Sequence, residues 1–404
     1  MSIILFIAYG LIFGSPLTFL PTFLNLTNIV VILSLLLLLR YNVKFDIKKI
    51  SFYLLPLFLY LIYDFSLFRY NDLSFHIQAV RLIGINIASY IIAYILVNHL
   101  SINTIKFYKY LSIFIFISCF VSILSIPFND IQKTINLIIK PNMNEGVLDY
   151  INNFRFNGLT GLSASELSLI YSTFFIYYTL IIKDSFKKIL YINIAAIIVI
   201  VGILIVGRTG LISSFICFLL MSIYLKKYSS LIYSALAIII FILLSFFIYN
   251  YSELIPSEIR RILLWAFEPI YKGLFMNELS GSNDVLVKMW YWPKNEFDIL
   301  FGIGSWGELI IPPDGLYKPD PGYMRMMYQH GIIIELIGLV IILSSIFYLK
   351  NTISRYIYFI LMIIAFLLNF KEIYIYRDPL FALLSITYYL SISKKEYNFR
   401  KSHE

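Results

Sequence analysis

Long apolar runs recur along the whole 404-residue chain, and they limit the possible folds more than any other feature. Each run has about 18 to 22 residues, and an α-helix of that length crosses the hydrocarbon core of a bilayer. Hydrophobic residues make up 60% of the chain and charged residues 14%, which is more apolar surface than a soluble protein of this size buries. The sequence therefore predicts an all-α polytopic integral membrane protein.

The apolar runs divide into twelve expected membrane spans, which together form a single membrane domain over residues 1–404. The least regular places are the split at Gly207 and the last span, which carries Arg377 and Asp378. The expected spans are 3–20, 23–39, 50–68, 79–98, 107–126, 161–182, 189–206, 207–225, 231–249, 331–349, 353–370 and 376–391.

Lysine and arginine are concentrated in every second loop, and this asymmetry predicts the orientation. With a cytoplasmic N-terminus, the inner segments hold 17 Lys and Arg against 4 Asp and Glu, whereas the rest of the chain holds 15 against 19. The inner segments are 40–49, 99–109, 183–188, 226–227, 350–355 and 392–404. Both termini are therefore expected in the cytoplasm, and the net charge of +9 reflects orientation toward an anionic leaflet, not nucleic-acid binding.

Two polar segments are expected on the outer side of the membrane. The first, 127–160, is rich in asparagine, and the second, 250–330, contains prolines and all four tryptophans. A segment of the second one's length is too long for a simple connector, so we expect it to be partly folded and functional. It would connect the ninth and tenth spans as a large extracytoplasmic loop.

Arginines mark the outer ends of several expected spans. Guanidinium is always charged and binds phosphate oxygens through paired hydrogen bonds, so these positions favour a lipid-borne phosphate. The alternative is that they only anchor helix ends at the interface. Arg208 is the strongest candidate for function, because a turn as short as the one expected there has little need of a cation. The set is Arg155, Arg208, Arg260, Arg261 and Arg325.

The residues that lead into the tenth span include candidates for acid–base chemistry. Asp320 before Pro321 predicts a helix N-cap. On the helix that follows, Tyr323, Met327 and His330 are expected on one face. His330 is a candidate base near neutral pH, and its alternative role is packing between helices.

Glu166 and Glu335 lie about one turn inside the sixth and tenth expected spans. Because a carboxylate in a membrane is costly, each should face a wet cavity or a cation. Glu166 is expected to pair with Arg155 or Arg208, or to act as a base. For Glu335 we expect a polar contact between helices.

No metal or cofactor site is expected. Cys119 and Cys217 lie inside apolar runs, which favours small buried side chains over ligands. The triplet Glu296-Phe297-Asp298 is most simply a solvated acidic loop.

Four short motifs, in this order, resemble the Wzy-type O-antigen and capsule repeat-unit polymerases and the O-antigen ligases. As architecture the resemblance covers most of the chain. The motifs are Arg155-Phe156-Asn157-Gly158-Leu159-Thr160-Gly161, Gly207-Arg208-Thr209-Gly210-Leu211, Leu300-Phe301-Gly302-Ile303-Gly304, and Asp320-Pro321-Gly322-Tyr323 through His330-Gly331-Ile332.

The resemblance implies a metal-independent, inverting transferase of the membrane-embedded C-type, with its site on the outer face of the bacterial inner membrane. Its donor would be a glycan on undecaprenyl diphosphate, and a flippase and a chain-length regulator would be partners. The arginines named above would hold the diphosphate, together with Lys288, which stands where relatives often have arginine. Tyr323 and Trp290 would bind sugar. His330, Asp320 and Glu166 compete for the role of base.

Polymerisation, in which a growing lipid-linked glycan moves onto a new lipid-linked repeat unit, is the favoured function. The first alternative is a ligase that passes the glycan to lipid A core. The second, from another class, is a flippase for lipid-linked oligosaccharides. A flippase should carry charges along several spans and lack a large outer loop, and this sequence has the opposite pattern.

Overall fold

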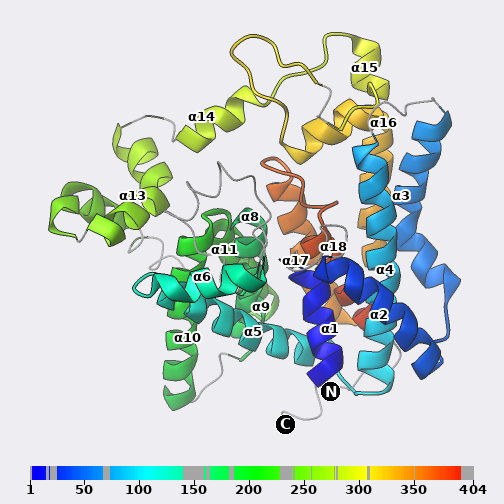
Figure 1. The fold of residues 1–404 in the computed structure, drawn as a ribbon, viewed down its shortest axis with the longest axis horizontal. Helices are drawn as coiled ribbons and strands as arrows, with labels where there is room; N and C mark the ends of the chain where they lie inside the picture. Colours follow the sequence, from blue (N-terminus) through cyan, green and yellow to red (C-terminus); the bar gives the residue numbers. More distant parts are fainter. Residues whose placement is uncertain are drawn as a thin grey trace. The chain divides into compact units, whose positions relative to one another are not determined.

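The computed structural model describes most of the chain, with gaps in several segments. The described residues are 2–14, 18, 25–66, 73–139, 159–160, 164–181, 186–227, 239, 242–255, 257–276, 278, 281–306, 310–349 and 351–392. Within them the regular elements are helices, and no β-strand is formed (Figure 1). The chain divides into two compact units. The first comprises 1–14, 21–109 and 289–404, and the second comprises 15–20 and 110–288.

The first unit contains α1 to α4 and α15 to α18. Helix α4 packs against α18, α2, α3 and α1, and α3 also packs against α16. Asparagine side chains start two of the helices: Oδ1 of Asn25 accepts from the amide of Asn28, and Oδ1 of Asn351 accepts from Ile353. The helices are α1 (Ser2–Ile12), α2 (Leu26–Tyr41), α3 (Ile47–Ser66), α4 (Ser74–Asn98), α15 (Glu296–Phe301), α16 (Gly322–Ser344), α17 (Thr352–Leu368) and α18 (Asp378–Ile392).

The second unit is built around α11, which packs against α8, α9 and α10. Helix α10 ends at Val206 and α11 begins at Thr209, so the helices change at the Gly207-Arg208 pair, as expected. The helices are α6 (Asn129–Ile138), α8 (Ala164–Ser172), α9 (Phe174–Ile181), α10 (Phe186–Val206), α11 (Thr209–Tyr224), α13 (Ser257–Tyr271) and α14 (Gly281–Lys288), with a π-helical turn at Lys272–Met276. Helix α5 (Thr104–Leu124) begins in the first unit and continues into the second.

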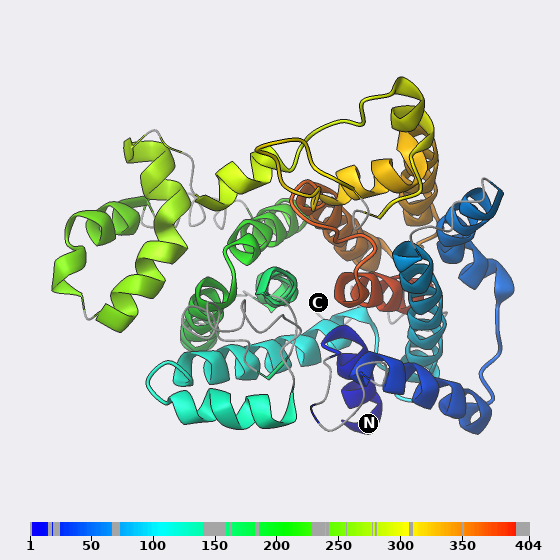
Figure 2. The same cartoon turned by 45° about the horizontal axis from the view of Figure 1, so that its top comes forward.

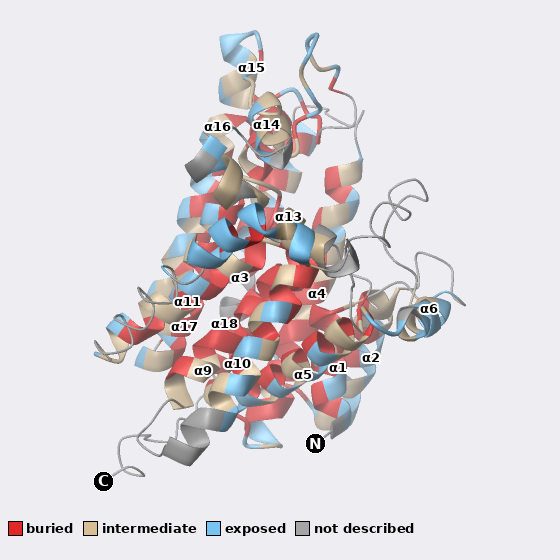
Figure 3. Ribbon diagram, turned by 90° about the vertical axis from the view of Figure 1, so that its left-hand side faces the viewer, coloured by how far each residue is buried: buried red, intermediate tan, exposed pale blue. Residues whose placement is uncertain are grey.

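Three described helices are long and apolar enough to cross a membrane: Ser74–Asn98, Thr104–Leu124 and Gly322–Tyr348. Seven shorter apolar helices accompany them. Many apolar side chains on these helices are exposed. Figure 3 shows exposed positions in pale blue among the buried red ones. An all-helical architecture with such surfaces is that of a membrane protein. The number of twelve spans and their sidedness stay predictions.

The last expected span is the most buried helix of the first unit. Helix α18 begins at Asp378, so Arg377 and Asp378 lie at its N-terminal end and not in its interior. A carboxylate oxygen of Asp378 lies 2.6 Å from Nη2 of Arg81 on α4. Deeper in, the Tyr389 hydroxyl donates to Asn86 at 2.6 Å, and Tyr108 shares a hydrogen bond with Thr387. These bonds satisfy polar groups that would be costly in an apolar core.

Helix α16 consists of two arms that meet at Gly331. This glycine has φ 79° and ψ 163°, a conformation open in practice only to glycine. The bend is visible where the chain changes direction between its golden and orange parts (Figure 2). The second arm starts where the tenth span was expected, at residue 331. Segment 250–330 contains the first arm together with α13, α14 and α15, and its place as an outer loop stays a prediction.

Candidate functional site

A polar cluster lies where α3, α4 and the first arm of α16 meet in the first unit. Asp64 is in the last turn of α3, His76 is in the first turn of α4, and His330 is the last residue before the Gly331 bend. Asp64 and His330 are fully buried, and His76 is 8% exposed. Each side chain therefore comes from a different helix end, close to the places where the chain leaves its apolar helices.

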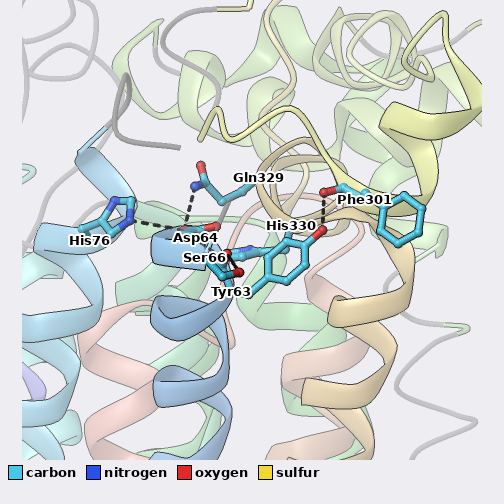
Figure 4. A network of polar contacts seen from close by, with 7 residues as sticks. All are labelled: Tyr63, Asp64, Ser66, His76, Phe301, Gln329 and His330. Atoms are coloured by element: carbon cyan, nitrogen blue, oxygen red, sulfur yellow. Dashed lines mark hydrogen bonds and ion pairs between the residues drawn. The ribbon is translucent and has the colours of Figure 1, made fainter. Parts of the chain in front are cut away.

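One carboxylate oxygen of Asp64 is the centre of the cluster (Figure 4). Its Oδ2 accepts a hydrogen bond from Nε2 of Gln329 at 3.0 Å. Nε2 of His330 lies 3.3 Å from the same oxygen, and Nε2 of His76 lies 3.4 Å from it. Three nitrogen-bearing side chains thus surround a single oxygen atom.

Because the cluster is buried, a negative charge on Asp64 needs compensation. An isolated carboxylate in an apolar interior costs several kcal/mol unless a cation or strong hydrogen bonds compensate it. Gln329 supplies one hydrogen bond, and either histidine supplies a positive charge when it is protonated. Asp64 therefore places a carboxylate oxygen beside an imidazole nitrogen of each histidine, an arrangement that suits a histidine acting as a general base.

Aromatic rings enclose His330. The Tyr60 and Phe75 rings each lie 4.5 Å from the imidazole, measured between ring centroids, and Trp306 lies 4.7 Å from Phe75. The Tyr63 hydroxyl donates to the carbonyl of Phe301 at 2.7 Å, which ties the end of α15 to α3 (Figure 4). A shell of this kind excludes water and strengthens the electrostatic interactions inside it.

The glycine segment, residues 302–304 after α15, holds the bend at Gly331 in place. The amide of Ile303 donates to the carbonyl of Tyr328 at 2.7 Å, and Gly304 donates to Gln329 at 3.2 Å. These bonds satisfy carbonyls that the first arm of α16 leaves open at its C-terminal end. A Cβ on Gly302 would lie 2.6 Å from the Gly331 nitrogen, so both positions require glycine.

The three candidate bases have different surroundings. His330 lies in the cluster, whereas Glu166 is buried at the start of α8 in the second unit. Asp320 forms an ion pair with Arg325. The predicted N-cap at Asp320 is wrong: α16 begins at Gly322 after Pro321, without a side-chain cap. The amides of Gly322 and Tyr323 donate to the carbonyl of Asn369, and the Asp320 carboxylate pairs with Arg325.

Sequence reasoning missed Asp64, His76 and Gln329. The signal for Asp64 was a carboxylate inside an apolar run, the same signal that identified Glu166 and Glu335. Nothing local indicated that residues 64, 76 and 330 meet.

Most of the cations that were expected to bind phosphate form ion pairs or hydrogen bonds with other groups of the protein. Arg208 lies 3.1 Å from Glu268, with its Cζ 4.7 Å from the centroid of the Trp265 ring. Lys288 pairs with Asp284 at 2.8 Å, and Nε of Arg260 donates to the carbonyl of Ile255. Arg155 lies outside the described residues, as does the side chain of Arg261.

Glu268 forms ion pairs with two cations. Lys272 lies 3.0 Å from the second oxygen of this carboxylate, so two cations share one anion. The hydrogen bond to Glu268 raises the pKa of Lys272, which keeps the ammonium charged at neutral pH. Arg208 and Lys272 therefore flank the Glu268 carboxylate at the junction of α10 and α11.

Trp290 and Tyr323 line a hollow of about 210 Å³ beneath the bend of α16. Glu335 borders this hollow and is 5% exposed. The expected polar contact of Glu335 between helices is not formed: within the described part of the chain its carboxylate has no hydrogen bond or ion pair, and Oε1 is buried. No group of three or more His, Cys, Asp or Glu in that same part is arranged to hold a metal ion.

Comparisons with protein-family models, with curated proteins and with solved structures found no match to this chain.

Proposed function

We propose that the protein is a membrane glycosyltransferase that polymerises lipid-linked repeat units, with His330 as the general base. The buried pair of His330 and Asp64 carries this proposal. A histidine whose orientation is set by a carboxylate is a common arrangement for taking a proton from a hydroxyl group. The sequence motifs named above supply the reaction class.

In the proposed reaction a hydroxyl of the acceptor sugar attacks the anomeric carbon of the donor glycan. The new C–O bond forms as the bond to the diphosphate oxygen breaks, and the diphosphate takes the electron pair. The hydroxyl proton passes to His330. Because Nε2 of His330 faces Asp64, Nδ1 is the nitrogen that would accept it. Asp64 would then stabilise the imidazolium.

The leaving diphosphate requires neutralisation more than protonation, since it is already a good leaving group. We assign this role to arginines, first of all Arg208. A guanidinium binds phosphate oxygens through paired hydrogen bonds, and Arg208 belongs to one of the motifs that resemble the repeat-unit polymerases. Arg155 and Arg325 stay candidates for the same role. No metal ion is part of this proposal.

The full burial of His330 adds a condition to the proposal. The acceptor reaches the imidazole only after covering aromatic rings move aside. Phe75 and Trp306 are the rings to move, and Trp306 follows the glycine segment 302–304. Substrate binding would therefore involve a rearrangement of this segment, as in other transferases with mobile loops.

The test is the surface glycan of a strain that lacks the protein. A polymerase predicts a single repeat unit on the final acceptor, and return of long chains when the wild-type gene is restored. Complete absence of glycan on the acceptor would indicate a ligase instead. Lipid-linked units that accumulate on the inner leaflet would indicate a flippase and overturn the proposal.

A further inference from the structure

The hollow beneath the bend of α16 combines features that a catalytic role does not explain. It is lined by Trp290, Trp292, Tyr323 and Phe370, by aliphatic and thioether side chains, and by Glu335. The rings of Trp290 and Phe370 stack with centroids 5.6 Å apart, and Tyr323 meets Phe370 edge-on at 4.8 Å. A buried carboxylate thus borders an aromatic enclosure.

The carboxylate of Glu335 needs a partner that the described residues do not supply. It lies four residues into the second arm of α16, so it is about one turn below the bend. An ionisable group at this depth in an apolar helix is costly and normally indicates a bound partner. The partner that complements a carboxylate framed by aromatic faces is an organic ammonium ion.

A sugar fits the hollow less well, although Trp290 and Tyr323 were expected to bind one. A pyranose carries several hydroxyl groups, and each that is buried without a partner costs about 1–3 kcal/mol. Apart from Glu335, the lining consists of aromatic, aliphatic and thioether side chains, among them Met324, Met327 and Leu339. One carboxylate cannot satisfy a whole sugar ring.

Below the hollow the second arm of α16 presents an apolar track. Leu336, Val340 and Leu343 follow at intervals of three and four residues, and their side chains are 55%, 63% and 40% exposed. A track of this kind accommodates an acyl chain.

We infer that the hollow binds an aminophospholipid, with its primary ammonium at Glu335 and an acyl chain along Leu336, Val340 and Leu343. Anionic lipids without an amine are disfavoured, because their charge has the same sign as the Glu335 carboxylate. This lipid site does not depend on the proposed transferase activity.

The experiment uses the purified full chain in nanodiscs and follows quenching of tryptophan fluorescence, since Trp290 and Trp292 line the hollow. The probes are phosphatidylethanolamine and phosphatidylglycerol with brominated acyl chains. We expect half-maximal quenching at an about tenfold lower mole fraction of phosphatidylethanolamine, which corresponds to about 1.4 kcal/mol. Equal quenching by the two lipids would show that any acyl chain enters, and would overturn the inference.

Glu335→Gln keeps the shape of the side chain and removes its charge, and it should bring the ratio between the two lipids close to one. Glu335→Leu should do the same, with folding checked by circular dichroism and monodisperse elution. Glu296→Gln is the matched control, because Glu296 is exposed on α15 and does not line the hollow, so this variant should keep the preference. A preference that survives Glu335→Gln would contradict the inference.

Two further measurements distinguish this lipid site from the site of the proposed reaction. If a brominated monoglucosyl diacylglycerol quenches more strongly than phosphatidylethanolamine, the hollow binds a sugar headgroup, and the inference is overturned. A His330→Gln variant should keep the lipid preference whether or not it transfers glycan. Loss of transfer with intact lipid preference would therefore concern only the proposed function.

Discussion

Nε2 of His330 lies 3.3 Å from Oδ2 of Asp64, and both side chains are completely buried. The two residues are 266 positions apart in the sequence and come from helices α16 and α3. Because the glycine segment after α15 fixes the bend behind His330, the imidazole is held by backbone geometry on one side and by the carboxylate on the other.

Replacing Asp64 with asparagine tests the importance of the carboxylate charge. Asparagine keeps the size of the side chain but cannot stabilise an imidazolium ion, so the transfer rate should fall on the order of 100-fold. The measurement is the initial rate of glycan extension by purified protein. Expression and elution should match the wild type, and a wild-type rate in a well-folded variant would remove Asp64 from the reaction.

His76 provides a comparison within the same cluster. Its Nε2 contacts the same oxygen of Asp64 as His330 does, at 3.4 Å. If His330 is the base, His76→Gln should lower the transfer rate only about tenfold or less, since the carboxylate and the base remain. A larger loss in His76→Gln than in His330→Gln, measured side by side, would exchange the roles of the two histidines.

Arg208 is expected to act through the paired N–H donors of its guanidinium group as well as through its charge. Arg208→Ala should abolish long glycan chains while protein level and membrane insertion stay normal, and Arg208→Lys should restore only part of the activity. The readout is the glycan ladder on a gel. Lys133→Ala is the control, because Lys133 belongs to an exposed ion pair with Asp130 and should have no effect. Wild-type chain lengths in Arg208→Ala would disprove the phosphate role.

Gly331→Ala should destabilise the protein by about 2–4 kcal/mol. An alanine there requires a positive φ, and its Cβ would overlap the carbonyl oxygen of Leu300. Gly273→Ala is the matched control, since nothing lies within 4 Å of a Cβ at that position. Thermal unfolding in detergent, followed by size-exclusion fluorescence, measures both. Equal midpoints for the two variants would show that the bend tolerates a side chain.

The apolar runs were sufficient to predict an all-helical architecture, because helix formation in them follows from local composition. They did not predict α6, α13, α14 and α15, which lie in the polar segments. The helix change at Gly207 and the start of the second arm at Gly331 also follow from local signals, since glycine interrupts helices in both places. The N-cap at Asp320 was predicted wrongly because a local pattern cannot reveal that the first amides of α16 donate to the carbonyl of Asn369, which is distant in the sequence.

The cluster itself is a product of tertiary structure. His330 was recognisable as a candidate base, but its partner Asp64 was not, because contacts between α3, α4 and α16 depend on helix packing. A single sequence does not show which distant residues come together in the fold, so residues 64, 76 and 330 could not be grouped in advance. The same limit applies to Glu335, whose aromatic surroundings come from segments around residues 290, 323 and 370.

The most direct test of the account is the steady-state kinetics of purified His330→Gln with lipid-linked repeat units as substrate. Removing the base should lower kcat on the order of 100-fold or more, while KM changes by less than about threefold, because the histidine acts on the proton and not on donor binding. A kcat equal to that of the wild type, in protein that elutes as a folded species, would contradict the assignment of His330 as the base.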